Sequence, residues 1–136
     1  MGRPDEANLS EWRRVARRDW HRVRVLLDDG DGEGAGFFLQ QAVEKFLKGF
    51  LIRNGWRLKK IHTLHALLDD AARFDPPLAA FRPFCERASN YYVVDRYPGL
   101  GAEGPDVAQV EQDLRRSPAT YPEPVRRRAF GLTTYE

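Results

Sequence analysis

The sequence has little of what defines several large classes of protein. Its single cysteine, Cys85, can form neither a disulfide within the chain nor a cysteine-based metal site, which favours a reducing compartment. No apolar run is long enough to span a bilayer, and residues 1–20 are rich in charge and lack the apolar core of a signal peptide. We therefore expect a cytoplasmic protein that does not enter the membrane.

Net charge is also scarce. The 22 lysines and arginines outnumber the 20 aspartates and glutamates by only 2, which does not by itself indicate a nucleic-acid-binding protein. The chain of 136 residues is long enough for one domain and too short for two. What distinguishes the sequence is the distribution of its charge, because arginine is crowded into a few segments.

Helical periodicity dominates the chain, and no segment of useful length alternates as a strand would. The spacing of apolar residues predicts helices over residues 8–29, 35–54, 63–74, 77–95 and 106–116. Asn8 and Glu11 resemble a capping box at the first helix, and Gly55 suits a C-terminal cap of the second. The glycine-rich stretch 28–34 predicts the loop between them.

These elements predict an all-α, up-and-down bundle of four to five helices. We assign residues 1–116 to this helical domain and residues 117–136 to a tail rich in proline and arginine. The tail is expected to be extended or partly disordered, because its prolines prevent the last helix from continuing.

Two surfaces of the predicted helices allow both a structural and a functional interpretation. The first helix has an arginine-rich face, which is either a solvated surface or one that faces phosphate; it comprises Arg13, Arg14, Arg17, Arg18, Arg22 and Arg24. The second helix has a polar stripe at positions i, i+3, i+4 and i+7: Gln41, Glu44, Lys45 and Lys48. A stripe of Glu and Lys is normally solvent-exposed.

Residues with reactive side chains form no recognisable catalytic pattern. His62 and His65 are three residues apart, but two ligands do not make a metal site, so we expect no metal and no cofactor. Cys85 lies at helical spacing among apolar residues and is predicted to be in the core. Tyrosines surround Asp95 and Arg96; they either stack bases beside a phosphate-binding arginine or simply pack at a helix end.

A series of motifs resembles a known family. The stretch Gln-Gln-Ala-Val-Glu-Lys-Phe-Leu-Lys over residues 40–48 is followed by Gly55, by His62 with leucines after it, and by Arg96-Tyr97-Pro98. In this order and spacing, over roughly residues 9–98, they resemble the HEPN domain, the helical module named for nucleotide binding in higher eukaryotes and prokaryotes.

The resemblance implies a homodimer that often works beside a minimal nucleotidyltransferase. Several HEPN lineages are metal-independent ribonucleases that use an arginine followed four to six residues later by a histidine; here no histidine follows Arg96, the one catalytic candidate. The residues expected to bind nucleotide or phosphate are Lys45, Lys48, His62, Arg96 and Tyr97. Those expected to line a cleft or contact a partner are Gln41, Glu44 and Asp95.

The leading prediction from the resemblance is therefore a nucleotide-binding and interaction module, partnered with a nucleotidyltransferase in a two-component system of the toxin–antitoxin kind. Two alternatives stay open. One is a metal-independent endoribonuclease toxin with a non-standard active site, acting on RNA. The other is a purely structural helical subunit, which would bind neither nucleotide nor RNA.

Overall fold

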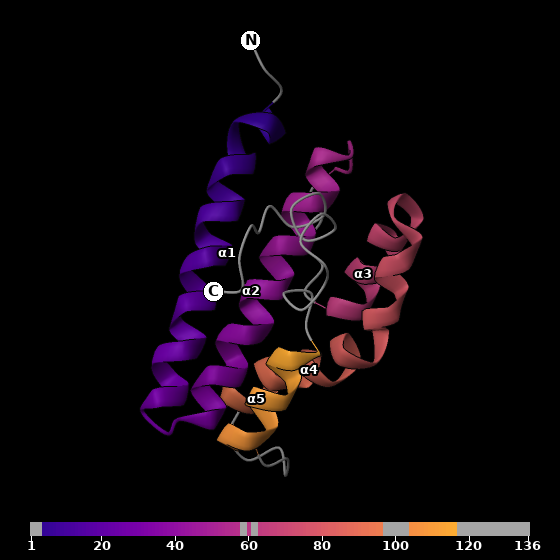
Figure 1. Ribbon diagram of the computed structural model, residues 1–136. Coiled ribbons are helices and arrows are strands. Elements are labelled where there is room, and N and C mark those ends of the chain that lie inside the picture. The colour runs from indigo at the N-terminus through magenta and orange to yellow at the C-terminus, as the bar shows by residue number, and fades with distance from the viewer. Residues whose placement is uncertain (1–3, 58–59, 61–62, 97–103, 117–136) are drawn as a thin grey trace.

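The computed structural model of the chain describes residues 4–57, 60, 63–96 and 104–116. These residues form no strand and five α-helices: α1 (Pro4–Asp28), α2 (Gly32–Arg53), α3 (Leu64–Phe74), α4 (Arg82–Arg96) and α5 (Val107–Arg115). A 3-10 helix, η1 (Pro76–Phe81), precedes α4 (Figure 1). The predicted all-α bundle is confirmed. The predicted tail over residues 117–136 lies outside the described residues.

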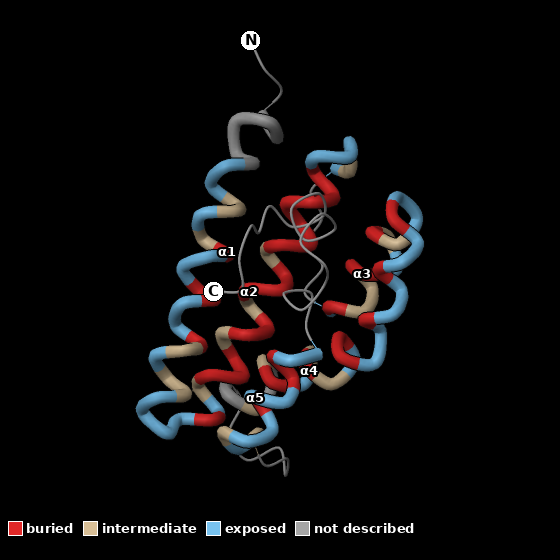
Figure 2. Tube along the Cα trace, in the orientation of Figure 1, coloured by how far each residue is buried: buried red, intermediate tan, exposed pale blue. Residues whose placement is uncertain are grey.

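α2 is the central helix of the bundle. α1 pairs with it along its length, and α3, α4 and α5 also contact it (Figure 1). Because its apolar residues occur all round the helix, most of α2 is buried, whereas α1 alternates between buried and exposed residues (Figure 2). Leu39, Leu47 and Leu51 of α2 are wholly enclosed and form the middle of the core.

The start of the first helix was predicted wrongly. α1 begins at Pro4, so Asn8 and Glu11 lie within the helix and form no capping box. Proline is favoured at the first helical position, because its fixed φ suits the helix and its missing N–H is not needed there. The apolar periodicity that marks the buried face therefore begins later than the helix itself.

The start of the second helix was also predicted wrongly. α2 begins at Gly32, inside the stretch expected to be a loop, and the side chain of Asp31 caps it by accepting a hydrogen bond from the N–H of Gly34 at 2.8 Å. A β-carbon at Gly36 would lie 2.7 Å from Cγ of Pro105, and one at Gly32 would lie 2.5 Å from the carbonyl oxygen of Pro105. Glycine is needed there so that the segment before α5 can pack against α2.

The remaining elements follow the sequence more closely. The predicted fourth helix is divided, with η1 over its first residues and α4 from Arg82. Gly55 adopts a φ of +87° directly after α2, as expected of a C-terminal cap. Cys85 is buried in the core, as predicted. Among the described helices, none combines the length and the apolar character needed to cross a membrane.

Candidate functional site

A buried carboxylate with several cations lies where α1 packs against α2. Asp19 of α1 is fully buried. Arg22 lies 3.2 Å and Arg18 3.5 Å from its Oδ1, and Lys45 of α2 donates to its Oδ2. The side chains of Arg18 and Arg22 are 45% and 44% exposed, and that of Lys45 is 17% exposed. Asp19 is therefore held from inside the bundle by cations that extend to its surface.

This arrangement leaves positive charge in excess. An isolated ionised carboxylate is very costly to bury, and the cations around Asp19 remove most of that cost. One negative charge, however, balances only one of the three positive charges that meet it. We call Asp19, Arg18, Arg22 and Lys45 the Asp19 cluster; at its surface it can attract a further anion.

Hydrogen bonds connect the Asp19 cluster to the polar stripe of α2. Lys45 donates from Nζ to Oε1 of Gln41 at 3.4 Å, and Gln41 donates to Oε1 of Gln40 at 2.7 Å. Gln40 in turn donates to Oε1 of Glu44 at 3.5 Å. Gln40 is fully buried and was not among the predicted site residues. It nevertheless connects one half of the stripe, Gln41 and Lys45, to the other half, Glu44 and Lys48.

The second half of the stripe is buried, contrary to the exposure normal for a run of Glu and Lys. Glu44 is 5% and Lys48 4% exposed. Nζ of Lys48 lies 3.6 Å from Oε2 of Glu44 and 5.8 Å from the centre of the Trp12 ring. Because α2 is enclosed by other elements, even its polar residues are buried. A periodic pattern shows which residues share a face but not whether that face is covered.

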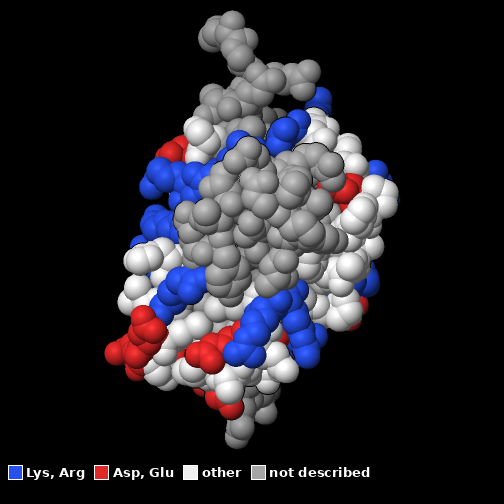
Figure 3. Space-filling view, viewed as in Figure 1, with Lys and Arg blue, Asp and Glu red and all other residues white. Residues whose placement is uncertain are grey.

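The arginine-rich face of α1 divides into three parts with different electrostatics. Lysine and arginine atoms gather along this helix in Figure 3. Arg14 is paired with the exposed Glu11 at 2.7 Å, and Arg18 and Arg22 belong to the Asp19 cluster. The pKa of Arg13 is lowered, first by burial and then by the positive charges of Arg53 and Arg17.

The structure brings four of the predicted site residues together, and these are Gln41, Glu44, Lys45 and Lys48. Arg96 is the last residue of α4; the side chains of Arg96 and Asp95 lie outside the described part of the chain, as do His62 and Tyr97 altogether. Within the described part, no three His, Cys, Asp or Glu side chains are grouped so that they could hold a metal ion.

A second buried carboxylate went unnoticed in the sequence. Asp113 of α5 is 1% exposed, accepts a hydrogen bond from the hydroxyl of Tyr91, and lies 3.0 Å from Nη2 of Arg87. The pKa of Tyr91 is raised, chiefly by burial and then by its contact with Asp113. Tyr92 stacks on Phe37 with ring centres 5.8 Å apart. The structural interpretation therefore holds for these two tyrosines, which pack within the bundle.

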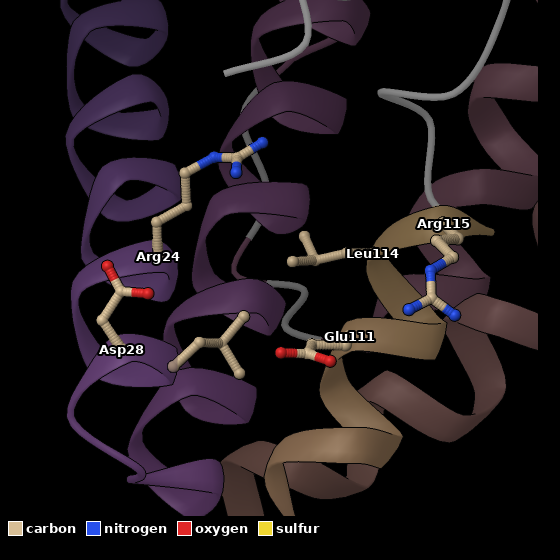
Figure 4. Close-up of a pocket in the computed structure, with 6 residues that line it drawn as sticks. Arg24, Asp28, Glu111, Leu114 and Arg115 are labelled. Carbon is tan, nitrogen blue, oxygen red and sulfur yellow. The ribbon is translucent and has the colours of Figure 1, made fainter.

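Among the cavities on the described surface, one between α1 and α5 and one at the end of α2 contain no predicted site residue. A cavity of about 270 Å³ lies between α1 and α5, where Glu111 of α5 points toward α1 (Figure 4). Its charges are balanced; its lining is Arg24, Leu27, Asp28, Glu111, Leu114 and Arg115. A cavity of about 330 Å³ lies at the C-terminal end of α2; its lining is Phe50, Arg53, Asn54, Phe74 and Asp75.

Comparison with known proteins places this architecture in a family. The family model of the HEPN domain matches residues 9–117, which takes in all of the Asp19 cluster, the polar stripe and α5. No curated protein and no solved structure matched the chain. Since the matched residues make up well over half of the sequence and the described residues form the expected helical bundle, the chain belongs to the HEPN domain family.

Proposed function

We propose that the protein is a binding module for the phosphates of a nucleotide or of RNA, and that it acts as a homodimer beside a minimal nucleotidyltransferase. The observation that carries the proposal is the Asp19 cluster, in which three cationic side chains meet one carboxylate. A surface with unbalanced positive charge, part of it on arginine, suits phosphate oxygens.

Lys45 is better placed than Lys48 to contribute to this binding. Lys45 is part of the net positive Asp19 cluster and is 17% exposed. Lys48 is almost fully enclosed and balanced by Glu44, so its main effect is on the stability of α2. The resemblance to the HEPN family adds Arg96, Tyr97 and His62 to the proposed ligand contacts, and Gln41, Glu44 and Asp95 to the residues proposed to line a cleft or contact a partner.

The dependence of binding on salt tests the role of the Asp19 cluster. We would measure the affinity of the full-length protein for a single-stranded RNA oligonucleotide over a range of salt concentrations. Each phosphate contact contributes about 0.7 to the slope of log affinity against log salt. Replacing Arg18 and Arg22 together by glutamine should therefore reduce that slope by about 1.4.

A matched control removes two arginines elsewhere. Arg82, the first residue of α4, is already paired with Asp69 of α3 and Glu86 of α4, and Arg116 follows α5. The double variant Arg82→Gln/Arg116→Gln therefore loses the same charge away from the cluster. Its salt slope should stay close to that of the wild type. Equal slopes for all three proteins would contradict the proposal.

Arg96 and the partner require separate experiments. Arg96→Ala should abolish binding of nucleotide and RNA while the helical content, measured by circular dichroism, stays unchanged; unchanged binding would remove Arg96 from the site. Purification of the tagged protein from its native cell at low salt, followed by mass spectrometry, should recover a nucleotidyltransferase. RNA without such a protein would instead favour a ribonuclease.

A further inference from the structure

We propose that Phe38 is a positioning residue of the phosphate-binding surface: its ring holds the guanidinium of Arg22 so that the N–H groups of that guanidinium are ready for a phosphate. The proposal rests on the proposed phosphate-binding function. It adds to that function an uncharged residue that was not among the predicted site residues. Phe38 lies in α2, and Arg22 lies in the neighbouring α1. The contribution of Phe38 to binding is therefore made through Arg22.

The guanidinium of Arg22 is held at two points. Its Nη1 lies 3.2 Å from Oδ1 of Asp19, and its Cζ lies 5.2 Å from the centre of the Phe38 ring. A cation within about 6 Å of the centre of an aromatic ring is attracted by the electrons of the ring face. Arg22 is thus fixed along one edge by a carboxylate and on one face by a ring.

These two contacts leave Arg22 able to bind a phosphate. A guanidinium is planar and its N–H groups point outward in that plane, whereas an aromatic ring contacts its face. The ring of Phe38 therefore does not compete with a phosphate for the N–H groups of Arg22. The side chain of Arg22 is 44% exposed, so a ligand can reach it. An arginine that is already oriented loses less conformational freedom when the ligand binds, which favours binding.

The ring of Phe38 is in turn held by two other rings. Phe38 is half-buried and meets Phe37 edge to face, with the ring centres 5.1 Å apart and the planes at 80°. Phe37 is 5% exposed and stacks on Tyr92 of α4, with the centres 5.8 Å apart. We call Phe38, Phe37 and Tyr92 the aromatic row. Turning the ring of Phe38 away from Arg22 would break its contact with Phe37.

The aromatic row connects the helices that carry the two kinds of proposed phosphate contact. α4 packs closely on α2 at this level, since a β-carbon at Gly36 would lie 3.2 Å from Cδ2 of Tyr91. Tyr92 precedes Arg96 by four residues, which is about one turn of α4. The aromatic row therefore extends from Arg22 on α1 to a point one turn before Arg96.

The affinity for RNA over a range of salt concentrations tests the role of the ring. We would titrate the full-length protein with a single-stranded RNA oligonucleotide. Phe38→Leu keeps apolar bulk but loses the ring face, and it should weaken binding by about two- to fivefold, the effect of one exposed cation–π contact. The slope of log affinity against log salt should stay unchanged, because no charge is lost. Arg22→Gln, by contrast, should reduce that slope by about 0.7.

A double-mutant cycle with Arg22 distinguishes positioning from general packing. If the ring acts through Arg22, adding Phe38→Leu to Arg22→Gln should cause no further loss of RNA affinity. A ring that only supports the fold would instead weaken binding by the same factor with and without Arg22. Phe38→Tyr keeps the aromatic face and should recover the affinity that Phe38→Leu loses.

Nuclear magnetic resonance tests the aromatic row without RNA, using variants that leave Phe38 in place. The ring current of Phe38 should shift the side-chain N–H protons of Arg22 in the wild type. Tyr92→Leu removes the far end of the aromatic row and should move these resonances. Phe74→Leu is the matched control, because it removes a ring that pairs with Phe50, roughly 18 Å beyond Phe38 along α2. It should leave the resonances of Arg22 unchanged.

The outcomes separate this proposal from the broader function. RNA binding that is weakened by Arg22→Gln but not by Phe38→Leu would overturn the positioning role alone. The same conclusion would follow from an equal effect of Phe38→Leu with and without Arg22, or from Arg22 resonances that Tyr92→Leu does not move. RNA binding unaffected by Arg18 and Arg22 would overturn the phosphate-binding role of the Asp19 cluster, and the role of Phe38 with it.

Discussion

Two buried aspartates divide the molecule into regions with different electrostatics. Asp19, between α1 and α2, is 0% exposed and is met by Arg18, Arg22 and Lys45. Asp113, between α4 and α5, is 1% exposed and is met by one cation, Arg87, and by the neutral hydroxyl of Tyr91. Both carboxylates are enclosed to a similar degree, but only one of them is outnumbered by positive charge.

The difference shows how burial and function can be distinguished. A carboxylate balanced by one cation joins two helices and leaves no charge for a ligand, so Asp113 is a tether for α5. Asp19 meets three cations, so part of the positive charge around it is not balanced, and this is where we propose that an anion binds. Charge balance, more than burial, separates the two.

The largest effect on the free energy of unfolding is expected at the Glu44–Lys48 pair. This pair is enclosed and balanced in charge, in contrast to the neighbouring Asp19 cluster. Lys48→Met leaves the carboxylate of Glu44 buried without its cation, which should lower the free energy of unfolding by about 3–5 kcal/mol. The double variant Glu44→Met/Lys48→Met should recover most of this loss, because the carboxylate that Lys48 faces is then removed as well. Urea unfolding of the three proteins measures both values. A single variant as stable as the double variant would contradict this explanation.

The next largest effect is expected at Asp113. Asp113→Ala removes the acceptor of Tyr91 and the partner of Arg87, and it should lower the free energy of unfolding by about 2–3 kcal/mol. The effect is smaller than at Lys48, because the side chain of Arg87 is 36% exposed and can turn to solvent. RNA affinity should not change. A loss of RNA binding in the folded variant would show that α5 belongs to the binding surface.

A smaller effect on stability, with an opposite effect on binding, is expected at Asp19. Asp19→Asn removes the one negative charge of the Asp19 cluster and should lower the free energy of unfolding by about 1–2 kcal/mol, since its cations reach solvent. RNA should bind more tightly, because the positive charge is no longer offset. Salt-dependent titration measures the affinity. Weaker binding would show that Asp19 positions the cations rather than limiting their charge.

The smallest effect is expected at mildly alkaline pH, from two buried groups of α4. Burial raises the pKa of Cys85 from 9.0 to about 12, and the pKa of Tyr91 is raised as well. The unfolded chain therefore loses these protons first, so stability is complete below about pH 9 and falls as the pH rises toward 12. At most, each group contributes about 1.4 kcal/mol per pH unit.

Urea unfolding between pH 8 and pH 10 tests this expectation, with Tyr91→Phe and Cys85→Ala as the informative variants. In the unfolded chain the thiol of Cys85 has an ordinary pKa of 9.0 and the hydroxyl of Tyr91 one of 10.0. Cys85→Ala should therefore make the loss of stability less steep from about pH 9, and Tyr91→Phe should do so only as the pH nears 10. A slope unchanged in both variants would show that the alkaline loss arises elsewhere in the molecule.

Much of the fold could be predicted from local patterns in the sequence. The spacing of apolar residues predicted the five helices, Gly55 marked the end of α2, and Cys85 was correctly placed in the core. These features depend on neighbouring residues, which fix helical periodicity and the conformations that glycine permits. Gln41, Glu44, Lys45 and Lys48 were correctly grouped on one helix for the same reason.

The tertiary structure decided the rest, because it depends on residues that are distant in the sequence. Gly32 lies in α2 although it was predicted to lie in a loop, and the chain at Pro105 packs closely against both Gly32 and Gly36. Lys45 meets Asp19 and Arg87 meets Asp113 across 26 positions of sequence. The sequence determined which faces the helices have, and only their packing decided which of those faces are covered and which charges are left in excess.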